Sequence, residues 1–220
     1  MTVPPGTAGA ENPERPRRAQ QERSRLAQQK ILDAAVRVLD KHGYAKTSTL
    51  RIQKEAGVSR GGLLNHFPSR DKLLVAAVHH LALEWVTNLG TRAQWAADPV
   101  ERIAEAIDTM WATYSQPYFW ASVELWVAAR SHEDLRLALL PKEYLMGSVI
   151  RASADALFGP ALSSHPSYPV VRDLVITSMR GVALTYALDN RDPTKDPHLK
   201  HWNTVATTML LEAEQNGSLP

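Results

Sequence analysis

Apolar residues recur at intervals of three and four from about residue 25 to the end of the chain, and no segment alternates apolar and polar residues as a half-buried strand does. This periodicity predicts an all-α fold of about nine helices. The predicted helices cover residues 25–41, 49–56, 59–67, 69 to beyond 85, 99–114, 117–131, 132–157, 170–188 and 198–215.

Glycine and proline residues divide these helices. Gly43 lies just past the first helix, Gly57 makes the turn after the second, and Pro68 prevents the third from continuing. Pro141 must kink or restart the seventh helix. Residues 158–169, which contain three prolines, form the longest predicted linker.

Three regions follow from the composition. Residues 1–22 are rich in proline, glycine, alanine and charge, which is typical of a disordered arm, here with a basic end. Residues 23–68 form a small helical domain and residues 69–220 a larger one. The arm lacks the apolar stretch of a signal peptide, no apolar run is long enough to cross a membrane, and cysteine is absent. We therefore expect a cytoplasmic protein without disulfides.

Charge is distributed unevenly between the two parts of the chain. Residues 1–70 hold 13 Lys/Arg and 6 Asp/Glu, a balance of +7, whereas residues 71–220 hold 12 and 17, a balance of −5. A basic segment suits a polyanion, because neutralised phosphates release condensed counterions. A merely solvated basic tail is the alternative.

The segment from residue 47 to residue 74 has the dimensions of a helix-turn-helix, in which the second helix lies in the major groove of DNA. Hydroxyls and helix N-termini at Thr49 and Ser59 offer donors to phosphates, and Arg70 adds a charged contact. The hydroxyl cluster before the second helix offers three possible caps. The apolar residues that hold the unit together are Ile52, Ala56, Val58, Leu63 and Phe67.

These residues resemble the signature of the TetR family of bacterial repressors. That signature runs as a hydroxyl-rich helix start, Ile-x-x-x-Ala-Gly-Val-Ser, Gly-x-Leu-Tyr-x-His-Phe and a lysine before a Leu-Leu pair. The chain matches it at Ile52, Ala56, Gly57, Val58, Ser59, Leu63, His66, Phe67, Leu73 and Leu74, with Gly61 or Gly62 as its glycine. Leu64 replaces the phosphate-contacting tyrosine and loses that contact, whereas Arg70 replaces the lysine and preserves its charge.

The resemblance and the residue chemistry together predict the DNA contacts. Arg60 suits guanine and Asn65 suits adenine, although either side chain could instead contact a phosphate. The two adjacent glycines either admit the backbone close to DNA or mark a helix that orders on binding. The predicted DNA-binding residues are Arg25, Thr47, Thr49, Ser59, Arg60, Gly61, Gly62, Asn65, His66 and Arg70.

In TetR-like proteins the later helices enclose a small-molecule pocket, so the resemblance implies an effector site here. Aromatic residues gather on the middle helices, where they line either an apolar pocket or the core. They favour an aromatic or hydrophobic effector. The predicted ligand-binding residues are Trp85, Trp111, Tyr114, Trp120, Trp126, Tyr144 and Met179.

The resemblance further implies a homodimer through the last two helices. The final helix carries an apolar stripe at Trp202, Val205, Ala206, Met209, Leu210 and Ala213, and the preceding one carries Val171, Leu174, Val175, Ser178, Val182, Thr185 and Leu188. Such a pair would space two recognition helices about one DNA turn apart, roughly 34–36 Å. The alternative is that both stripes face the core of their own chain.

The expected function is therefore a repressor that a small-molecule effector releases from a palindromic operator in double-stranded DNA, with the helix that begins near Ser69 coupling the two sites. The chain has histidine pairs but no ligand spacing, catalytic motif or phosphate loop. We predict no metal, cofactor, catalytic residue or membrane partner. A helical enzyme, or an interaction module whose helix-turn-helix no longer binds DNA, are the rival hypotheses.

Overall fold

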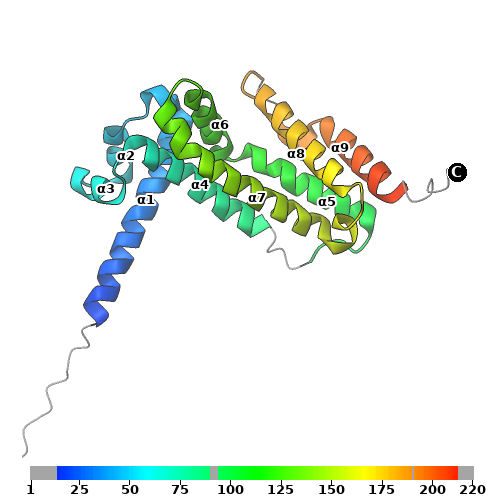
Figure 1. Cartoon of the computed structure of the whole chain (residues 1–220), viewed down its shortest axis with the longest axis horizontal. Coiled ribbons are helices and arrows are strands. Elements are labelled where there is room, and N and C mark those ends of the chain that lie inside the picture. Colours follow the sequence, from blue (N-terminus) through cyan, green and yellow to red (C-terminus); the bar gives the residue numbers. More distant parts are fainter. Residues whose placement is uncertain (1–13, 90–93, 190, 213–220) are drawn as a thin grey trace, which may run out of the picture.

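The computed structural model describes residues 14–89, 94–189 and 191–212, and within these ranges the chain forms nine α-helices and no strand (Figure 1). The predicted all-α class is confirmed. The helices are α1 (Glu14–Lys46), α2 (Thr49–Ala56), α3 (Arg60–His66), α4 (Arg70–Leu89), α5 (Pro99–Ala112), α6 (Pro117–Ala129), α7 (Glu133–Ser163), α8 (Tyr168–Thr185) and α9 (His198–Thr207).

Most helix boundaries follow the predicted caps and breaks. Ser48 caps α2 by accepting a hydrogen bond from the amide of Arg51, and Asp98 caps α5 in the same way. Gly43 adopts φ 70° and interrupts the helical backbone of α1. Gly57 adopts φ 66° after α2, a left-handed conformation that glycine accepts without strain.

The start of α1 differs from the prediction. A helix was expected from about residue 25, whereas α1 already begins at Glu14. Residues 14–22 of the predicted arm are therefore helical, and residues 1–13 lie outside the described part of the chain. The segment consists of good helix formers, and Pro16 falls in the first turn, where its missing N–H costs nothing.

The predicted linker at residues 158–169 is also mostly helical. The helix α7 runs through Pro141 without a non-helical residue there, and its one such residue is Gly159, at φ 79°. Pro160 then opens a further turn that reaches Ser163. The break is thus at a glycine rather than at Pro141, because only the glycine accepts a positive φ without cost.

Two large hydrophobic cores and a small third cluster of Ala82, Tyr118 and Met146 hold the helices together. The first joins the small N-terminal helices to α4, α6 and α7 through residues such as Leu39, Ile52 and Leu74. The second lies between α5, α8 and α9 and the end of α7, around Trp111 and Trp202. Figure 1 shows α1 to α3 at one end of the molecule and α8 and α9 at the other, with α4 and α7 running between them. The N-terminal unit therefore shares its core with the rest of the chain.

Candidate DNA-binding head and effector cavity

The helices α2 and α3 form the expected helix-turn-helix unit. After Gly57, Ser59 caps α3 by accepting a hydrogen bond from the amide of Gly62 at 3.1 Å. Ile52 and Leu63 are fully buried between the helices, and Phe67 is buried where α3 ends. Because the apolar residues point inward, the polar face of α3 is left to solvent.

The exposed face of this unit carries unpaired positive charge. Arg60, Gly61 and Asn65 are all exposed on α3. Arg51 and Lys54 are exposed on α2, and neither they nor Arg60 form an ion pair with any residue that the structure describes. The sequence analysis missed Arg51 and Lys54, whose positions three apart on one short helix were the available signal.

The double glycine in α3 has no positive φ, so the backbone conformation does not require it. A Cβ at Gly61 would meet nothing within 4 Å, whereas one at Gly62 would lie 3.2 Å from the hydroxyl of Ser59. The packing of the described chain therefore gives no reason for glycine at position 61. The surface above it is open to a partner.

Three of the predicted DNA contacts have their hydrogen-bond donors engaged within the chain. Thr47 is buried, and its hydroxyl donates to the carbonyl of Gly43 at 2.8 Å, so it offers no donor to a phosphate. Arg25 is exposed on α1 and pairs with Glu22 at 2.8 Å. Thr49, Ser59 and His66 keep partly or fully exposed surface.

Arg70 is the third of these residues. Its guanidinium donates to the backbone carbonyl of Tyr44 and lies 4.0 Å from the centre of the Tyr44 ring. In the chain without DNA the guanidinium is thus engaged internally, because the side chain folds back onto the end of α1, and its phosphate contact stays a prediction. Local sequence could not reveal this, since Tyr44 is far from Arg70 along the chain.

Tyr44 joins the N-terminal unit of α1, α2 and α3, here called the head, to the rest of the molecule. Its amide donates to Glu124 of α6 at 2.8 Å, and its hydroxyl donates to Asp71 of α4 at 2.9 Å. The Tyr44 ring lies edge-on to the ring of His132, with 5.4 Å between the two ring centres. Burial and the neighbouring Asp71 raise the pKa of Tyr44, so the hydroxyl stays a donor. The head is therefore fastened to the helices that follow it.

A cavity of about 410 Å³ lies among α4, α5, α6, α7 and α8. Apolar and aromatic side chains make up most of its wall, with a few ionisable groups among them. This is the usual composition of a small-molecule site. Of the seven predicted ligand-binding residues, Tyr114 and Trp126 line this cavity.

The other five lie elsewhere. Trp111 and Trp120 line a smaller cavity of about 300 Å³ beside α5 and α6, Met179 is fully buried in the core, and Tyr144 is 71% exposed on α7. Trp85 packs near Tyr118 at 6.5 Å but does not line the main cavity. Helical spacing alone could not tell these environments apart, because core, cavity and surface share one periodicity.

Three ionisable groups of the main cavity, those of His79, Glu143 and Arg180, lie close to one another. His79 of α4 lies 3.2 Å from Glu143 of α7. The guanidinium of Arg180 from α8 stacks over Trp126 of α6 at 5.2 Å. Burial alone would raise the pKa of Glu143, but contacts with His79 and Trp126 and the charge of Arg180 hold that pKa below its usual range. Glu143 is thus a carboxylate at neutral pH.

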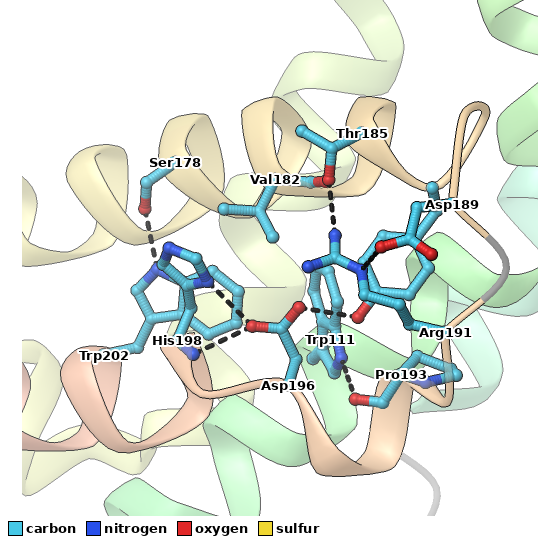
Figure 2. Close-up of polar contacts among 11 residues, drawn as sticks. Trp111, Ser178, Val182, Thr185, Asp189, Arg191, Pro193, Asp196, His198 and Trp202 are labelled. Atoms are coloured by element: carbon cyan, nitrogen blue, oxygen red, sulfur yellow. Dashed lines mark hydrogen bonds and ion pairs between the residues drawn. The ribbon is translucent and has the colours of Figure 1, made fainter.

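The connection between α8 and α9 is braced by a polar network (Figure 2). The buried carboxylate of Asp196 accepts hydrogen bonds from the hydroxyl of Tyr186 at 2.6 Å and from the amide of His198 at 2.8 Å. The indole N–H of Trp202 donates to Ser178 at 2.9 Å. These contacts hold α9 against α8.

The apolar residues of α8 separate into two faces. Val171 and Val175, which were predicted in the dimer face, are fully buried in the core of their own chain. Of the predicted stripe on the last helix, Trp202, Ala206 and Leu210 are buried, Val205 and Met209 are partly exposed, and Ala213 lies outside the described residues. The exposed apolar residues of α8 and the turn after it are Val170, Leu174, Leu184 and Leu188, between 43% and 93% exposed. Gly181 lies exposed among them. The outward stripe is therefore shifted from the predicted one.

Two negative findings apply to the described residues. No group of three or more histidine and carboxylate side chains is placed to hold a metal ion. None of the helices in these ranges is both long and apolar enough to cross a membrane.

Comparison with known proteins agrees with the geometry of the head. Residues 31–77 match the family described as "Bacterial regulatory proteins, tetR family". The chain is 30% identical over 116 residues to the HTH-type transcriptional regulator BetI of Brucella canis, which is 52% of this chain and 59% of that one. It thus spans about 59% of the length of this relative.

Two further proteins resemble most of the chain. An uncharacterized HTH-type transcriptional regulator of Mycobacterium bovis is 28% identical over 201 residues, 89% of this chain and 98% of that protein. The solved structure of the multidrug binding protein EbrR complexed with ethidium has a TM-score of 0.59 at 22% identity, covering 84% of this chain and 98% of that one. At this identity the second likeness concerns the fold alone.

Proposed function

Because this chain belongs to the TetR family of bacterial transcriptional regulators, we propose that it is a cytoplasmic, homodimeric repressor that a small molecule releases from a palindromic operator. The observation that carries this proposal is the helix-turn-helix of α2 and α3, whose outer face is exposed and basic. The three parts of the function use different surfaces of the molecule.

The DNA-reading part uses α3. In this arrangement α3 enters the major groove, where Arg60 takes guanine and Asn65 takes adenine. Arg51 and Lys54, exposed on α2, contact the phosphate backbone. The open surface at Gly61 supports close approach of the α3 backbone to DNA.

The dimer uses the outward stripe of α8, namely Val170, Leu174, Leu184 and Leu188 with Gly181. Burying these side chains against the same stripe of a second copy removes apolar surface from water, and the exposed glycine allows the helices to approach closely. Two-fold pairing makes the operator palindromic.

The sensing part uses the main cavity, and α4 couples it to the head. Val78, His79 and Val86 of α4 line the cavity, while Arg70 at the start of the same helix holds Tyr44. A ligand shifts repression only if it binds the DNA-competent and DNA-incompetent arrangements with different affinity. A ligand that tilts α4 would move Arg70 and, with it, the head.

The deciding experiment selects bound sequences from a random DNA pool with the purified protein at two salt concentrations. We expect an enriched palindrome whose binding weakens steeply with salt. Arg60→Ala should weaken the enrichment and relax the preference at one base pair, whereas Lys200→Ala, which removes an exposed charge on α9, should leave both unchanged. Retention of DNA without sequence preference, or no retention, would contradict the repressor.

A further inference from the structure

The main cavity contains two carboxylates, and both already have partners. Glu143 lies 3.2 Å from His79 and is held in its charged form by its neighbours. Asp173 accepts from the Nε of Arg172 at 3.0 Å. Each of the two carboxylates therefore already has a basic neighbour within the chain.

The groups left without a hydrogen-bond partner are donors. Among the described residues, the Nε of Arg180 and the hydroxyl of Tyr118 line the cavity, are buried as atoms and have no partner. Tyr118 as a whole is 9% exposed. A buried donor without an acceptor costs free energy that a bound acceptor would recover.

Arg180 also forms no close ion pair, although its charge acts on the nearby carboxylate of Glu143. No acidic side chain of the described residues lies within ion-pair distance of it, and its guanidinium rests on the ring of Trp126. This stacking leaves the edge of the guanidinium, with its N–H groups, for a planar acceptor. Tyr114 and Trp126 add flat apolar wall beside it.

Building on the proposed effector site, we propose that the cavity takes an apolar organic acid, an aryl or acyl body with one carboxylate that accepts hydrogen bonds from Arg180. The body lies against Trp126, Met146 and Ile150, and Tyr118 donates to a further acceptor on the ligand. An ammonium head in the same place would face the like charge of Arg180, while Glu143 and Asp173 already contact His79 and Arg172. The cavity therefore selects the charge of its ligand as well as its shape.

The test uses three probe series built on 2-naphthyl, 4-phenylbutyl and n-octyl bodies, each with a carboxylate, carboxamide or ammonium head. Binding is measured by quenching of tryptophan fluorescence and by calorimetry on the full-length protein. We expect the carboxylate to bind at least about tenfold more tightly than the matched amide or amine, because one charged hydrogen bond in a partly buried site contributes about this factor to the affinity.

Variants assign this preference to one residue. Arg180→Gln should abolish the preference for carboxylate, and Arg180→Lys should restore part of it, since the lysine keeps the charge but not the fork of donors. The matched control is Lys142→Gln, which removes an exposed cation of α7 that does not line the cavity and should leave the preference intact. Circular dichroism verifies the folding of each variant.

The outcomes separate this inference from the proposed function. A preference for the ammonium head, equal binding of all heads, absence of binding in every series, or a carboxylate preference that survives in Arg180→Gln would overturn the inference. If the same protein still enriches a palindrome from random DNA, the repressor assignment stands without it. If no DNA is selected but carboxylates bind through Arg180, the result supports the proposed class of effector and contradicts the proposed repressor function.

Discussion

The carboxylate of Glu124 on α6 accepts a hydrogen bond from the backbone amide of Tyr44 at 2.8 Å, across 80 residues of sequence. This contact ties the end of the first helical run to the helix that also carries Phe119 and Trp126 into the main cavity. Together with Arg70 on α4, Glu124 holds the head from two cavity-lining helices. The orientation of the head is therefore set by both helices.

Removal of this tie should loosen the head. We expect Glu124→Ala to lower the free energy of unfolding by about 1 kcal/mol, because the amide of Tyr44 loses its acceptor at a partly exposed site. Urea unfolding measures the change. Glu133→Ala, which breaks only an exposed pair with Arg136, should cost less. An equal loss of unfolding free energy in the two variants would show that the hydrogen bond between Glu124 and Tyr44 stabilises the protein no more than an exposed ion pair does.

Gly43 should tolerate no side chain. It adopts φ 70°, and a Cβ there would lie 3.0 Å from Oε2 of Glu124, so Gly43→Ala combines backbone strain with displacement of that carboxylate. We expect a loss of about 1–3 kcal/mol in thermal or urea unfolding. Gly61→Ala is the contrasting variant, because its Cβ enters open space in a helix of ordinary φ. It should stabilise the free protein and weaken its binding to DNA.

Arg60 should carry sequence information. Arg60→Ala is expected to weaken binding to the selected operator by about 1–3 kcal/mol and to relax the preference at one base pair. Lys54→Ala should instead weaken binding to all sequences alike and reduce the salt slope by about one. Fluorescence anisotropy at several salt concentrations distinguishes the two. The same effect from both variants would place Arg60 on a phosphate.

The outward stripe of α8 should control the oligomeric state. Leu174→Arg adds a charge to the proposed two-fold contact and should yield a monomer by light scattering, with loss of operator binding. Leu137→Arg, at an exposed apolar position of α7, serves as the control and should remain dimeric. A wild-type protein that is monomeric at operator-binding concentrations would rule out the α8 dimer.

The free energy of unfolding should depend on pH through the carboxylate of Asp196. Burial alone would raise the pKa of Asp196, but hydrogen bonds from Tyr186 and His198 hold it below its usual value. The stabilisation is complete above the pKa of the unfolded chain, about 4, and is lost as pH falls through the lower pKa of the folded state. Asp196→Asn should therefore be less stable at neutral pH, with a difference that narrows below about pH 4.

Urea unfolding of both proteins across this pH range measures the difference. Asp189→Asn breaks only an exposed pair with Arg191 and should behave like the wild type at every pH. A constant difference between Asp196→Asn and the wild type down to about pH 3 would mean that the charge of Asp196 is not what stabilises the network.

Local sequence patterns were sufficient to predict most of the helices and the helix-turn-helix of α2 and α3. The bounds of α2, the start of α5 at Pro99 and the turn at Gly57 depend on neighbouring residues, so the sequence predicted them correctly. The helical start at Glu14 and the helix through Pro141 were missed. In those segments, composition and proline content suggested breaks where the backbone remains helical.

Side-chain partners that are distant in the sequence could be identified only from the tertiary structure. Arg70, expected on a phosphate, holds Tyr44 in the chain without DNA, and the inward valines of α8 were expected at a dimer face. Periodicity identifies the apolar face of a helix, but it does not say which neighbour covers that face. Which donors remain unpaired in the cavity, as at Arg180, depends on the packing of five helices. Helix formation is local, whereas burial and pairing depend on contacts between segments far apart in the chain.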